Sequence, residues 1–465
     1  MSEILKIVEL IKSGKSSAKA EVEAAIARAE ADDSNAILEI IRERALARAD
    51  EIDARIAKGE DVGRLAGVPY VAKGNFLTHG SKTTAASKIL ENFEAPLQAT
   101  AVEKLEAEGA ICIGKANLDS FAHGGSTENS AFGVTKNAVD NERVAGGSSG
   151  GSAVVVAKGI VPFALGSDTG GSIRQPASFN GVIGYKPTYG MISRYGVVAM
   201  ASSTDVVGPI TRTVEDAELL CDIMAGRDSK DATISKEFFV PENNDSKKMK
   251  IGVIQEFMDD GVDGDVRRRI NQVVTDLAEA GHSVSNIKLP MVKYALPIYY
   301  IVVPAEISSN LARYDGVRYG TRSDSAKTLA EVYGQSRDQG FVDENKRRIM
   351  IGSYVLSSGF FDAYYLQAQK ARTLSINEFN KLFEKYDFLI GPVSPTPAFK
   401  IGERVDDPLK MYLADIMTVP ASLAGLPAIS IPAGEDENGL PIGVQIIGPM
   451  KSDAKLLNFA KGWRK

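Results

Sequence analysis

Residues 145–181 read "AGGSSGGSAVVVAKGIVPFALGSDTGGSIRQPASFNG". The stretch contains six serines, two glycine-rich turns and no histidine. Glycine-rich turns let the backbone approach a ligand closely, and serine becomes a nucleophile when an adjacent base takes its proton. The stretch therefore predicts a site, and the base for any reacting serine must come from elsewhere in the chain.

On both sides of this stretch, short β-rich runs alternate with helical segments. The runs are "GVPYVAKGN" (67–75), "AICIGKAN" (110–117), "GIVPFALGSD" (159–168) and "GVIGYKPT" (181–188), with a helix predicted at "TAVEKLEAEG" (100–109). The alternation resumes at 249–256, with a helix over 264–280 and a strand at 283–290. Residues 292–386 are mostly helical, strands follow at 388–393, 427–434 and 441–449, and a last helix begins at 452. This pattern predicts an α/β fold with a buried sheet.

The first sixty residues predict helices only, because 16–33 opens on serine caps and 35–60 keeps an apolar stripe at helical spacing. The lysine- and aspartate-rich segment 228–248 is expected to be a surface loop. With no repeat or low-complexity linker, we expect one large domain over 1–465. It has a helical N-terminal arm over 1–60 and a core at about 67–220.

The composition is that of a globular protein, with 44% hydrophobic and 25% charged residues in 465. A net charge of −6 argues against tight nonspecific binding to nucleic acid by this chain alone. Cys112 and Cys221 lie in apolar runs without a CxxC pair, which favours core thiols in a reducing compartment. No apolar run is long enough to span a membrane, so we expect a cytoplasmic protein with no membrane partner.

Familiar nucleophile patterns fit the serines poorly. G-x-S-x-G occurs around Ser148 and Ser149, but the preceding "NAVDNERVA" does not make the buried strand that a hydrolase elbow needs. Of the three histidines only His282 lies downstream, in a turn-like segment, which disfavours a Ser-His-Asp triad. The lysine of a phosphate loop is missing, and no His/Cys cluster predicts a metal site.

A lysine is the remaining candidate for the base. Lys73 follows the apolar strand "GVPYVA", which would carry its side chain into the interior. Burial disfavours the ammonium form and lowers the pKa of a lysine, so that a neutral amine is available. Most lysines at strand ends are solvated, so Lys73 by itself is a weak candidate for the base. The serine-rich stretch strengthens this interpretation.

Residues 145–196 resemble the amidase signature family, whose members use a Ser–cis-Ser–Lys triad. The resemblance implies Lys73 as the base, Ser148 as a bridging serine after a cis peptide bond, and Ser172 as the nucleophile. The two serines are 24 residues apart (172 minus 148), as in the family. It also implies a mixed sheet covered by helices, and no metal. The remaining serines, namely Ser149, Ser152, Ser167 and Ser178, are expected to be structural.

The turn "DTGGS" supplies the second part of the implied site. Backbone N–H groups from Thr169, Gly170 and Gly171 to Ser172 would converge on the oxyanion that forms when an amide carbonyl is attacked. Each such donor typically contributes about 2.7–4 kcal/mol of transition-state stabilisation. A reading as flexible glycine turns explains neither the serine spacing nor the lysine.

Other stretches are similar to one branch of that family, the glutamine-hydrolysing subunits of tRNA-dependent amidotransferases. They include "GSTENSAFGVTKNAVD" (125–140), "SSGFFDAYYLQAQKARTL" (357–374) and "DIMTVPASLAGLPAISIPAG" (415–434). The resemblance implies that Tyr299, Arg348 and Asp415 bind glutamine. Arg348 suits the α-carboxylate because a guanidinium pairs with it bidentately, and Asp415 suits the α-ammonium.

The same resemblance implies partners. This chain would form a heterotrimer with B and C subunits and pass ammonia to one of these partners. That partner would use ATP and Mg to activate the glutamate of Glu-tRNA(Gln), or the aspartate of Asp-tRNA(Asn). It would also make most of the tRNA contacts, so this chain needs no cofactor of its own.

Three residues depart from the family pattern, namely Gly74, Asn180 and Ala433, and the last two, which replace cysteines, are expected to be neutral to the chemistry. Gly74 follows Lys73 where the family usually has aspartate, which removes a charge next to the base. The chain could instead be a stand-alone signature amidase acting on another small amide. It could also be a scaffold subunit whose catalysis is weakened through Gly74.

Overall fold

The computed structural model describes residues 2–235, 239–241, 248–405 and 407–463. Within these residues, eleven strands form one mixed sheet in the order β1-β3-β2-β4-β6-β5-β10-β11-β9-β7-β8. The strands are β1 (Ile37–Ile40), β2 (Pro69–Lys73), β3 (Ile111–Ala116), β4 (Phe163–Asp168), β5 (Ile183–Lys186), β6 (Val206–Thr211), β7 (Lys250–Ile254), β8 (Ser283–Ile287), β9 (Phe388–Pro392), β10 (Ala428–Glu435) and β11 (Pro441–Ile447).

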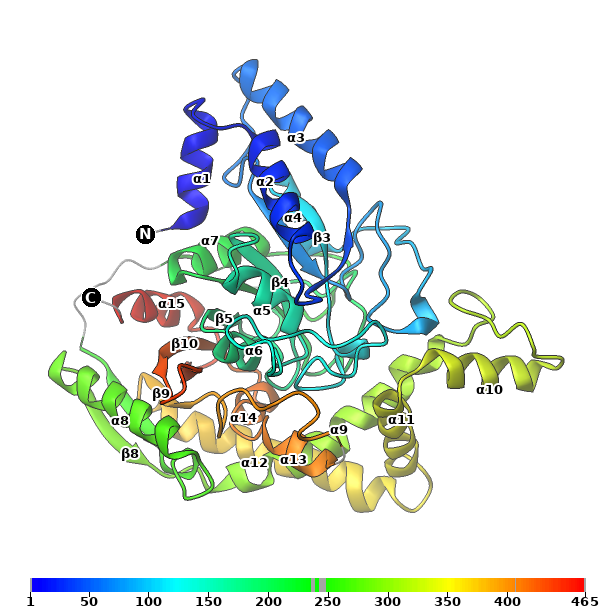
Figure 1. The fold of residues 1–465 in the computed structure, drawn as a ribbon. Coiled ribbons are helices and arrows are strands. Elements are labelled where there is room, and N and C mark those ends of the chain that lie inside the picture. The colour runs from blue at the N-terminus through cyan, green and yellow to red at the C-terminus, as the bar shows by residue number, and fades with distance from the viewer. Residues whose placement is uncertain (1, 236–238, 242–247, 406, 464–465) are drawn as a thin grey trace.

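Helices cover both faces of this sheet (Figure 1). They are α1 (Glu3–Lys12), α2 (Ala18–Glu30), α3 (Arg42–Ala57), α4 (Thr100–Ala107), α5 (Gly150–Ala157), α6 (Arg174–Phe179), α7 (Val214–Met224), α8 (Gly264–Glu279), α9 (Ala295–Asn310), α10 (Leu329–Gly340), α11 (Asp343–Val355), α12 (Leu366–Phe383), α13 (Pro408–Leu413), α14 (Val419–Leu423) and α15 (Asp453–Gly462). Short 3-10 or π turns occur at Lys88–Leu90, Ser120–Ala122, Gln255–Phe257, Pro290–Tyr294, Leu311–Arg313 and Phe361–Tyr365. The α/β fold expected from the sequence, with a mixed sheet covered by helices, is confirmed.

The sheet is mixed because a central run of antiparallel pairs from β4 to β9 is flanked by parallel pairs on both sides. Strand β2 runs parallel to both β3 and β4, while β6 pairs with β4 and β5 in the antiparallel sense. Strands β2 and β4 are buried along their whole length, which explains why they read as continuous apolar runs. Their carboxyl ends carry Lys73 and the turn at 169–172, so the sheet brings these two segments to the same edge.

The N-terminal region differs from the purely helical arm that we expected. Residues Ile37–Ile40 form β1, which pairs antiparallel with β3 at one edge of the sheet, and the helix α3 begins only at Arg42. The sequence "ILEI" is apolar at three of four positions and satisfies a helical stripe as easily as a strand. Pairing with the exposed edge of β3 decides the conformation, because it satisfies backbone groups there.

Strand β6 is a second element that the sequence pattern did not predict. Its run "VVGPIT" contains Gly208 and Pro209, both of which argue against a strand inside a sheet. Gly208 lies against the backbone of β5, where an added Cβ would come within 2.1 Å of the Tyr185 carbonyl oxygen. Close packing of neighbouring chain segments therefore selects residues that local propensity disfavours.

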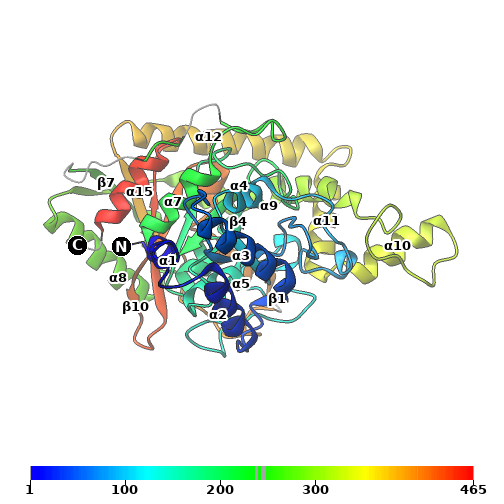
Figure 2. The same ribbon diagram turned by 90° about the horizontal axis from the view of Figure 1, so that it is seen from above.

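The remaining sequence predictions concern the two cysteines, the loop at 228–248 and the lack of membrane spans. Cys112 and Cys221 are buried free thiols, as predicted. Of the loop expected at 228–248, residues 236–238 and 242–247 lie outside the described residues, and the remainder forms turns and irregular chain. No helix among the described residues is long and apolar enough to cross a membrane. Seen from above, α10 projects away from the rest of the chain, and both chain ends lie on the opposite side (Figure 2).

Candidate active site

Lys73 is the last residue of β2, and its side chain is completely buried. Its Nζ lies 2.8 Å from Ser148 Oγ, 3.0 Å from Ser167 Oγ and 3.3 Å from the Ser167 carbonyl oxygen. Three oxygens therefore surround the amine, and none belongs to a carboxylate. The lysine and the first serine proposed from the sequence, which are 75 residues apart in the chain, are in direct contact.

Burial lowers the pKa of Lys73 from its ordinary value of 10.5 to about 7. The carboxylates of Asp119, Asp168 and Asp205 oppose this effect but do not overcome it. Near neutral pH a large fraction of the amine is therefore unprotonated and able to accept a proton. This is the state that a general base requires.

Ser148 follows a cis peptide bond, as predicted from the family resemblance. Its side chain is fully buried. The preceding Gly147 donates its N–H to Gln175 Oε1 at 2.9 Å, and a Cβ at Gly147 would lie 2.1 Å from Asp119 Oδ2. Only glycine fits there, so the backbone before Ser148 is enclosed on all sides.

Ser172 lies at the end of the turn that connects β4 to α6, and it keeps 8% of its surface exposed. Its carbonyl oxygen accepts a hydrogen bond of 3.1 Å from the N–H of Ser149, the residue after Ser148. The turn with the proposed nucleophile is thus joined to the segment with the proposed bridging serine. Ser172 is the member of the three that a substrate can reach from solvent.

The glycine turn itself is held by its carbonyl groups. Thr418 Oγ1 donates to the Gly170 carbonyl oxygen at 2.6 Å, and the Gln175 N–H donates to that of Gly171 at 2.8 Å. Within the part of the chain that the structure describes, the N–H groups of Gly170, Gly171 and Ser172 donate to no protein acceptor. Free N–H groups on a fixed turn are suited to binding an oxyanion. Thr169, the fourth residue proposed, is anchored through its hydroxyl to Asp205 Oδ1 at 2.7 Å.

Arg348 and Asp415 line one pocket, together with Gly124, Gly125 and Tyr412. Arg348 is almost fully buried, donates from Nε to Glu344 Oε1 at 2.8 Å and faces the rings of Tyr300 and Tyr412. Asp415 is half-buried, and burial raises the pKa of its carboxyl to about 7 although Arg348 opposes this shift. The pocket thus brings a buried guanidinium and a carboxyl that titrates near neutral pH into one lining, which also contains Glu128, Glu344, Arg347 and Arg404.

Tyr299 connects this pocket to the glycine turn. It is buried in α9, and a Cβ at Gly170 would lie 2.8 Å from its Oη and Cζ atoms. Its ring therefore packs directly against the turn that carries Ser172. Tyr299 does not itself line the pocket of Arg348 and Asp415, but its neighbour Tyr300 does.

The sequence reasoning missed several residues that contact this site. Ser167, expected to be merely structural, donates no bond to the triad but accepts one from Lys73, and Asn75 Nδ2 donates to the same Ser167 Oγ at 3.1 Å. Asp205 and Glu344 hold Thr169 and Arg348. Ser167 stands one position before the "DTGGS" motif, which is the only signal that could have pointed to it.

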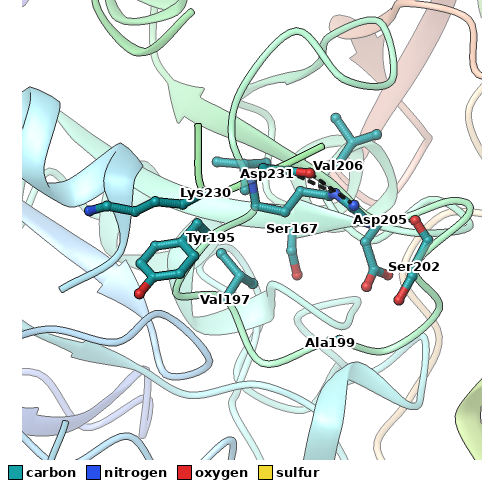
Figure 3. Close-up of a pocket in the computed structure, with 11 residues that line it drawn as sticks. Ser167, Tyr195, Val197, Ala199, Ser202, Asp205, Val206, Lys230 and Asp231 are labelled. Atoms are coloured by element: carbon teal, nitrogen blue, oxygen red, sulfur yellow. Dashed lines mark hydrogen bonds and ion pairs between the residues drawn. The ribbon is translucent and has the colours of Figure 1, made fainter. Parts of the chain in front are cut away.

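Ser167 is one of the residues that line a second pocket of about 190 Å³ (Figure 3). Arg194, Tyr195, Asp205, Lys230 and Asp231 also line it. Neither Ser172 nor Arg348 belongs to this lining, so this space is separate from the pocket of Arg348 and Asp415. Arg194 forms an ion pair of 3.3 Å with Asp231.

A family model described as Amidase matches residues 20–457 of this chain. The chain belongs to the amidase family. It is 52% identical over 457 residues to the A subunit of the glutamyl-tRNA(Gln) amidotransferase of Koribacter versatilis, covering 97% of this chain and 95% of the relative. The corresponding protein of Geobacillus thermodenitrificans, which carries the same name, is 54% identical over 435 residues, covering 92% of this chain and 89% of the relative.

A solved structure of the amidase family is similar to this chain in fold. The crystal structure of the A subunit of the glutamyl-tRNA(Gln) amidotransferase from Thermotoga maritima has 45% sequence identity and a TM-score of 0.75. The match covers 86% of this chain and 83% of that one. Among the described residues, no group of three or more His, Cys, Asp or Glu side chains is arranged to hold a metal ion.

Proposed function

We propose that this amidase-family chain is the glutamine-hydrolysing subunit of a tRNA-dependent amidotransferase. The observation that carries the proposal is the pocket in which Arg348 and Asp415 lie together. Thr418 joins Asp415 to the turn with Ser172, because its Oγ1 lies 2.6 Å from the Gly170 carbonyl oxygen and 3.1 Å from that of Asp415. A guanidinium and a carboxylate match the α-carboxylate and α-ammonium of an amino acid. This chain is 52% identical over nearly its whole length to the A subunit of a glutamyl-tRNA(Gln) amidotransferase, which supports glutamine as its substrate.

The reaction begins at the side-chain amide of glutamine. Ser172 Oγ attacks the amide carbon while its proton passes to Ser148, and the Ser148 proton passes to Lys73 across 2.8 Å. The negative oxygen of the tetrahedral intermediate accepts hydrogen bonds from the free N–H groups of the glycine turn. When the C–N bond breaks, the proton returns through Ser148 to the leaving nitrogen, and ammonia departs.

The second half of the reaction releases glutamate. The glutamyl group remains as an ester on Ser172, and a water molecule attacks it with Ser148 and Lys73 again accepting the proton. The ester bond breaks, Ser172 regains its proton and glutamate leaves. No proton is gained or lost by the enzyme over the cycle, so Lys73 begins and ends as the neutral amine.

The two relatives described above are A subunits of an amidotransferase, which supports a multi-subunit assembly for this chain. We propose a heterotrimer in the cytoplasm with B and C subunits, in which the partner uses ATP and Mg to activate Glu-tRNA(Gln) or Asp-tRNA(Asn) and receives the ammonia. The partner also makes most of the tRNA contacts. This chain contributes the glutaminase site and no cofactor.

Co-purification of the chain with its B and C subunits, followed by a glutaminase assay, tests the proposal. The wild-type complex should release glutamate, whereas Ser172→Ala and Arg348→Ala complexes should not. Ser152→Ala is the matched control, because Ser152 Oγ donates to the Leu165 carbonyl oxygen and contacts no triad member. A complex that ignores glutamine but cleaves aryl or acyl amides would instead be a stand-alone amidase. Unchanged amidotransferase function in Ser172→Ala would indicate a scaffold.

A further inference from the structure

The amine of Lys73 has a hydrogen-bond geometry that constrains its lone pair. A neutral lysine amine carries two N–H donors and one lone pair. Of its three oxygen neighbours, two belong to Ser167, the hydroxyl at 3.0 Å and the carbonyl at 3.3 Å, and the third is Ser148 Oγ at 2.8 Å. When both N–H groups donate to Ser167, the lone pair is left for the hydroxyl of Ser148.

Asn75 fixes the hydroxyl that makes this arrangement possible. Its Nδ2 donates to Ser167 Oγ at 3.1 Å, so that oxygen accepts hydrogen bonds from two sides. Both residues are buried, with Ser167 5% and Asn75 2% exposed. A buried hydroxyl with two donors aimed at its lone pairs is restricted to the role of acceptor toward Lys73.

The pocket in Figure 3 accounts for the remaining hydrogen of Ser167. Ser167 lies in the lining of this space of about 190 Å³, with its side chain directed inward between Asp205 and Val197. That volume is large enough for several water molecules. The Ser167 O–H can therefore donate to water in the pocket, away from Lys73, and need not compete with Ser148 for the lone pair.

We propose that Ser167, held by Asn75, is a positioning residue that directs the lone pair of Lys73 toward Ser148. This inference rests on the proposed function of the Ser172–Ser148–Lys73 triad. Ser167 has no hydrogen bond to the side chain of Ser148 or Ser172 and acts through its contact with Lys73. The residue is thus a fourth determinant of proton transfer, supplied by the end of β4 just before the glycine turn.

The proposal predicts a characteristic change in the pH profile. The charged groups that face Lys73 are Asp119 after β3, Asp168 at the end of β4 and Asp205 before β6, and all three favour the ammonium form. The Ser167 hydroxyl also accepts a bond from the ammonium, so its removal should lower the pKa of Lys73 further. Ser167→Ala should therefore shift the acid limb of kcat to lower pH while its plateau falls.

The experiment compares Ser167→Ala, Ser167→Thr and Ser152→Ala in the glutaminase assay, with Ser172→Ala to test the proposed function itself. Ser167→Ala should lower plateau kcat by about 10- to 100-fold, a part of the 10²–10⁴-fold typical of general-base catalysis. KM should stay unchanged, because Ser167 does not contact glutamine. Ser167→Thr retains the hydroxyl oxygen and should restore most of kcat, and Ser152→Ala should match the wild type.

Three results would overturn the inference. One is a plateau kcat in Ser167→Ala equal to that of the wild type; another is an equal loss in Ser152→Ala, which would indicate general loss of packing. The third is a fall in kcat with an unmoved acid limb and no rescue by threonine. Activity in Ser172→Ala would instead contradict the proposed function, so the two failures are distinguishable.

Discussion

Arg174 and Asp168 form a fully buried ion pair that brackets the glycine turn of the candidate site. Asp168 ends β4 and Arg174 begins α6, and the turn 169–172 lies between them. The guanidinium donates from Nε and Nη2 to the two carboxylate oxygens at 3.0 and 2.9 Å. Its remaining donors reach the Thr418 carbonyl oxygen at 3.0 Å, Gln445 Oε1 at 2.5 Å and Ser422 Oγ at 2.7 Å. The pair thus fixes both ends of the turn and ties them to α14.

Removal of the arginine should therefore destabilise the fold and the turn together. We expect Arg174→Leu to lower the free energy of unfolding by about 3–5 kcal/mol, since it leaves a buried carboxylate without its cation. Urea unfolding at pH 7 measures this loss. The double variant Arg174→Leu/Asp168→Leu is the control and should recover part of the stability; equal destabilisation in both would contradict the ion-pair explanation.

The pair also has a pH signature. Burial tends to raise the pKa of Asp168, but Arg174 outweighs it and holds that pKa below the ordinary 3.8. A depressed folded pKa contributes stability that is present above the unfolded value and is lost as pH falls through the folded value. In Arg174→Leu the carboxyl is buried without its cation, so acid unfolding should begin at a higher pH than in the wild type. Circular dichroism during acid titration measures the pH at which each protein begins to unfold.

The fold was predictable wherever the apolar pattern had a single interpretation. The buried strands β2 and β4 appear as short continuous apolar runs, and α8 has an apolar stripe at helical spacing. The structure places all three as expected. Segments with two interpretations were not predictable. The residues 37–40 become a strand because β3 offers an edge, and β6 forms despite Gly208 and Pro209 because its neighbours enclose it.

The buried neutral amine of Lys73 should support catalysis and at the same time lower the free energy of unfolding. Because the pKa of Lys73 is lowered from 10.5 to about 7, the unfolded chain binds a proton between these pH values that the folded chain releases. Wild-type stability should therefore rise with pH across this window. Lys73→Met should reduce that rise by its own share, since burial also lowers the pKa of Lys115 to about 8 and that of Lys186 to about 7. The variant should unfold at higher urea concentration than the wild type at pH 7–8 and lose about 10³-fold or more in kcat. A variant that is both inactive and less stable would indicate that the amine serves packing instead.

The candidate site was predictable only as far as its motif extends. Lys73, Ser148 and Ser172 were proposed from spacing and resemblance, and the structure places Lys73 against Ser148. Ser167 and Asn75 were missed because their relation to Lys73 depends on the register of β2 against β4. A serine and an asparagine in isolation carry no sequence signal of a contact that exists only once two strands have paired.

The glycine turn should tolerate no side chain at either central position. A Cβ at Gly171 would lie 2.2 Å from Thr418 Oγ1, and one at Gly170 would lie 2.8 Å from the Tyr299 ring. We expect Gly171→Ala to displace the turn and lower kcat by about 10²-fold or more, because the oxyanion donors move with it. Gly334→Ala is a control for glycine replacement outside the site, since Gly334 has no positive φ and nothing lies within 4 Å of its Cβ position. Steady-state glutaminase kinetics distinguish them, and an active Gly171→Ala would place the oxyanion donors elsewhere.

Asp415 should make glutamine binding depend on pH near neutrality. Burial raises the pKa of its carboxyl to about 7, so the fraction in the carboxylate form falls as pH drops below this value. Only the carboxylate pairs with an α-ammonium, and KM for glutamine should therefore rise between pH 8 and pH 6. In Asp415→Asn this dependence should disappear, with KM raised by about 10- to 100-fold at pH 8, the loss expected for a buried charged partner. The analogue that lacks the α-amino group separates this effect from the titration of Lys73, because its KM should be alike in the wild type and Asp415→Asn. A wild-type KM for glutamine that stays constant from pH 6 to pH 8 would show that Asp415 does not bind the ammonium.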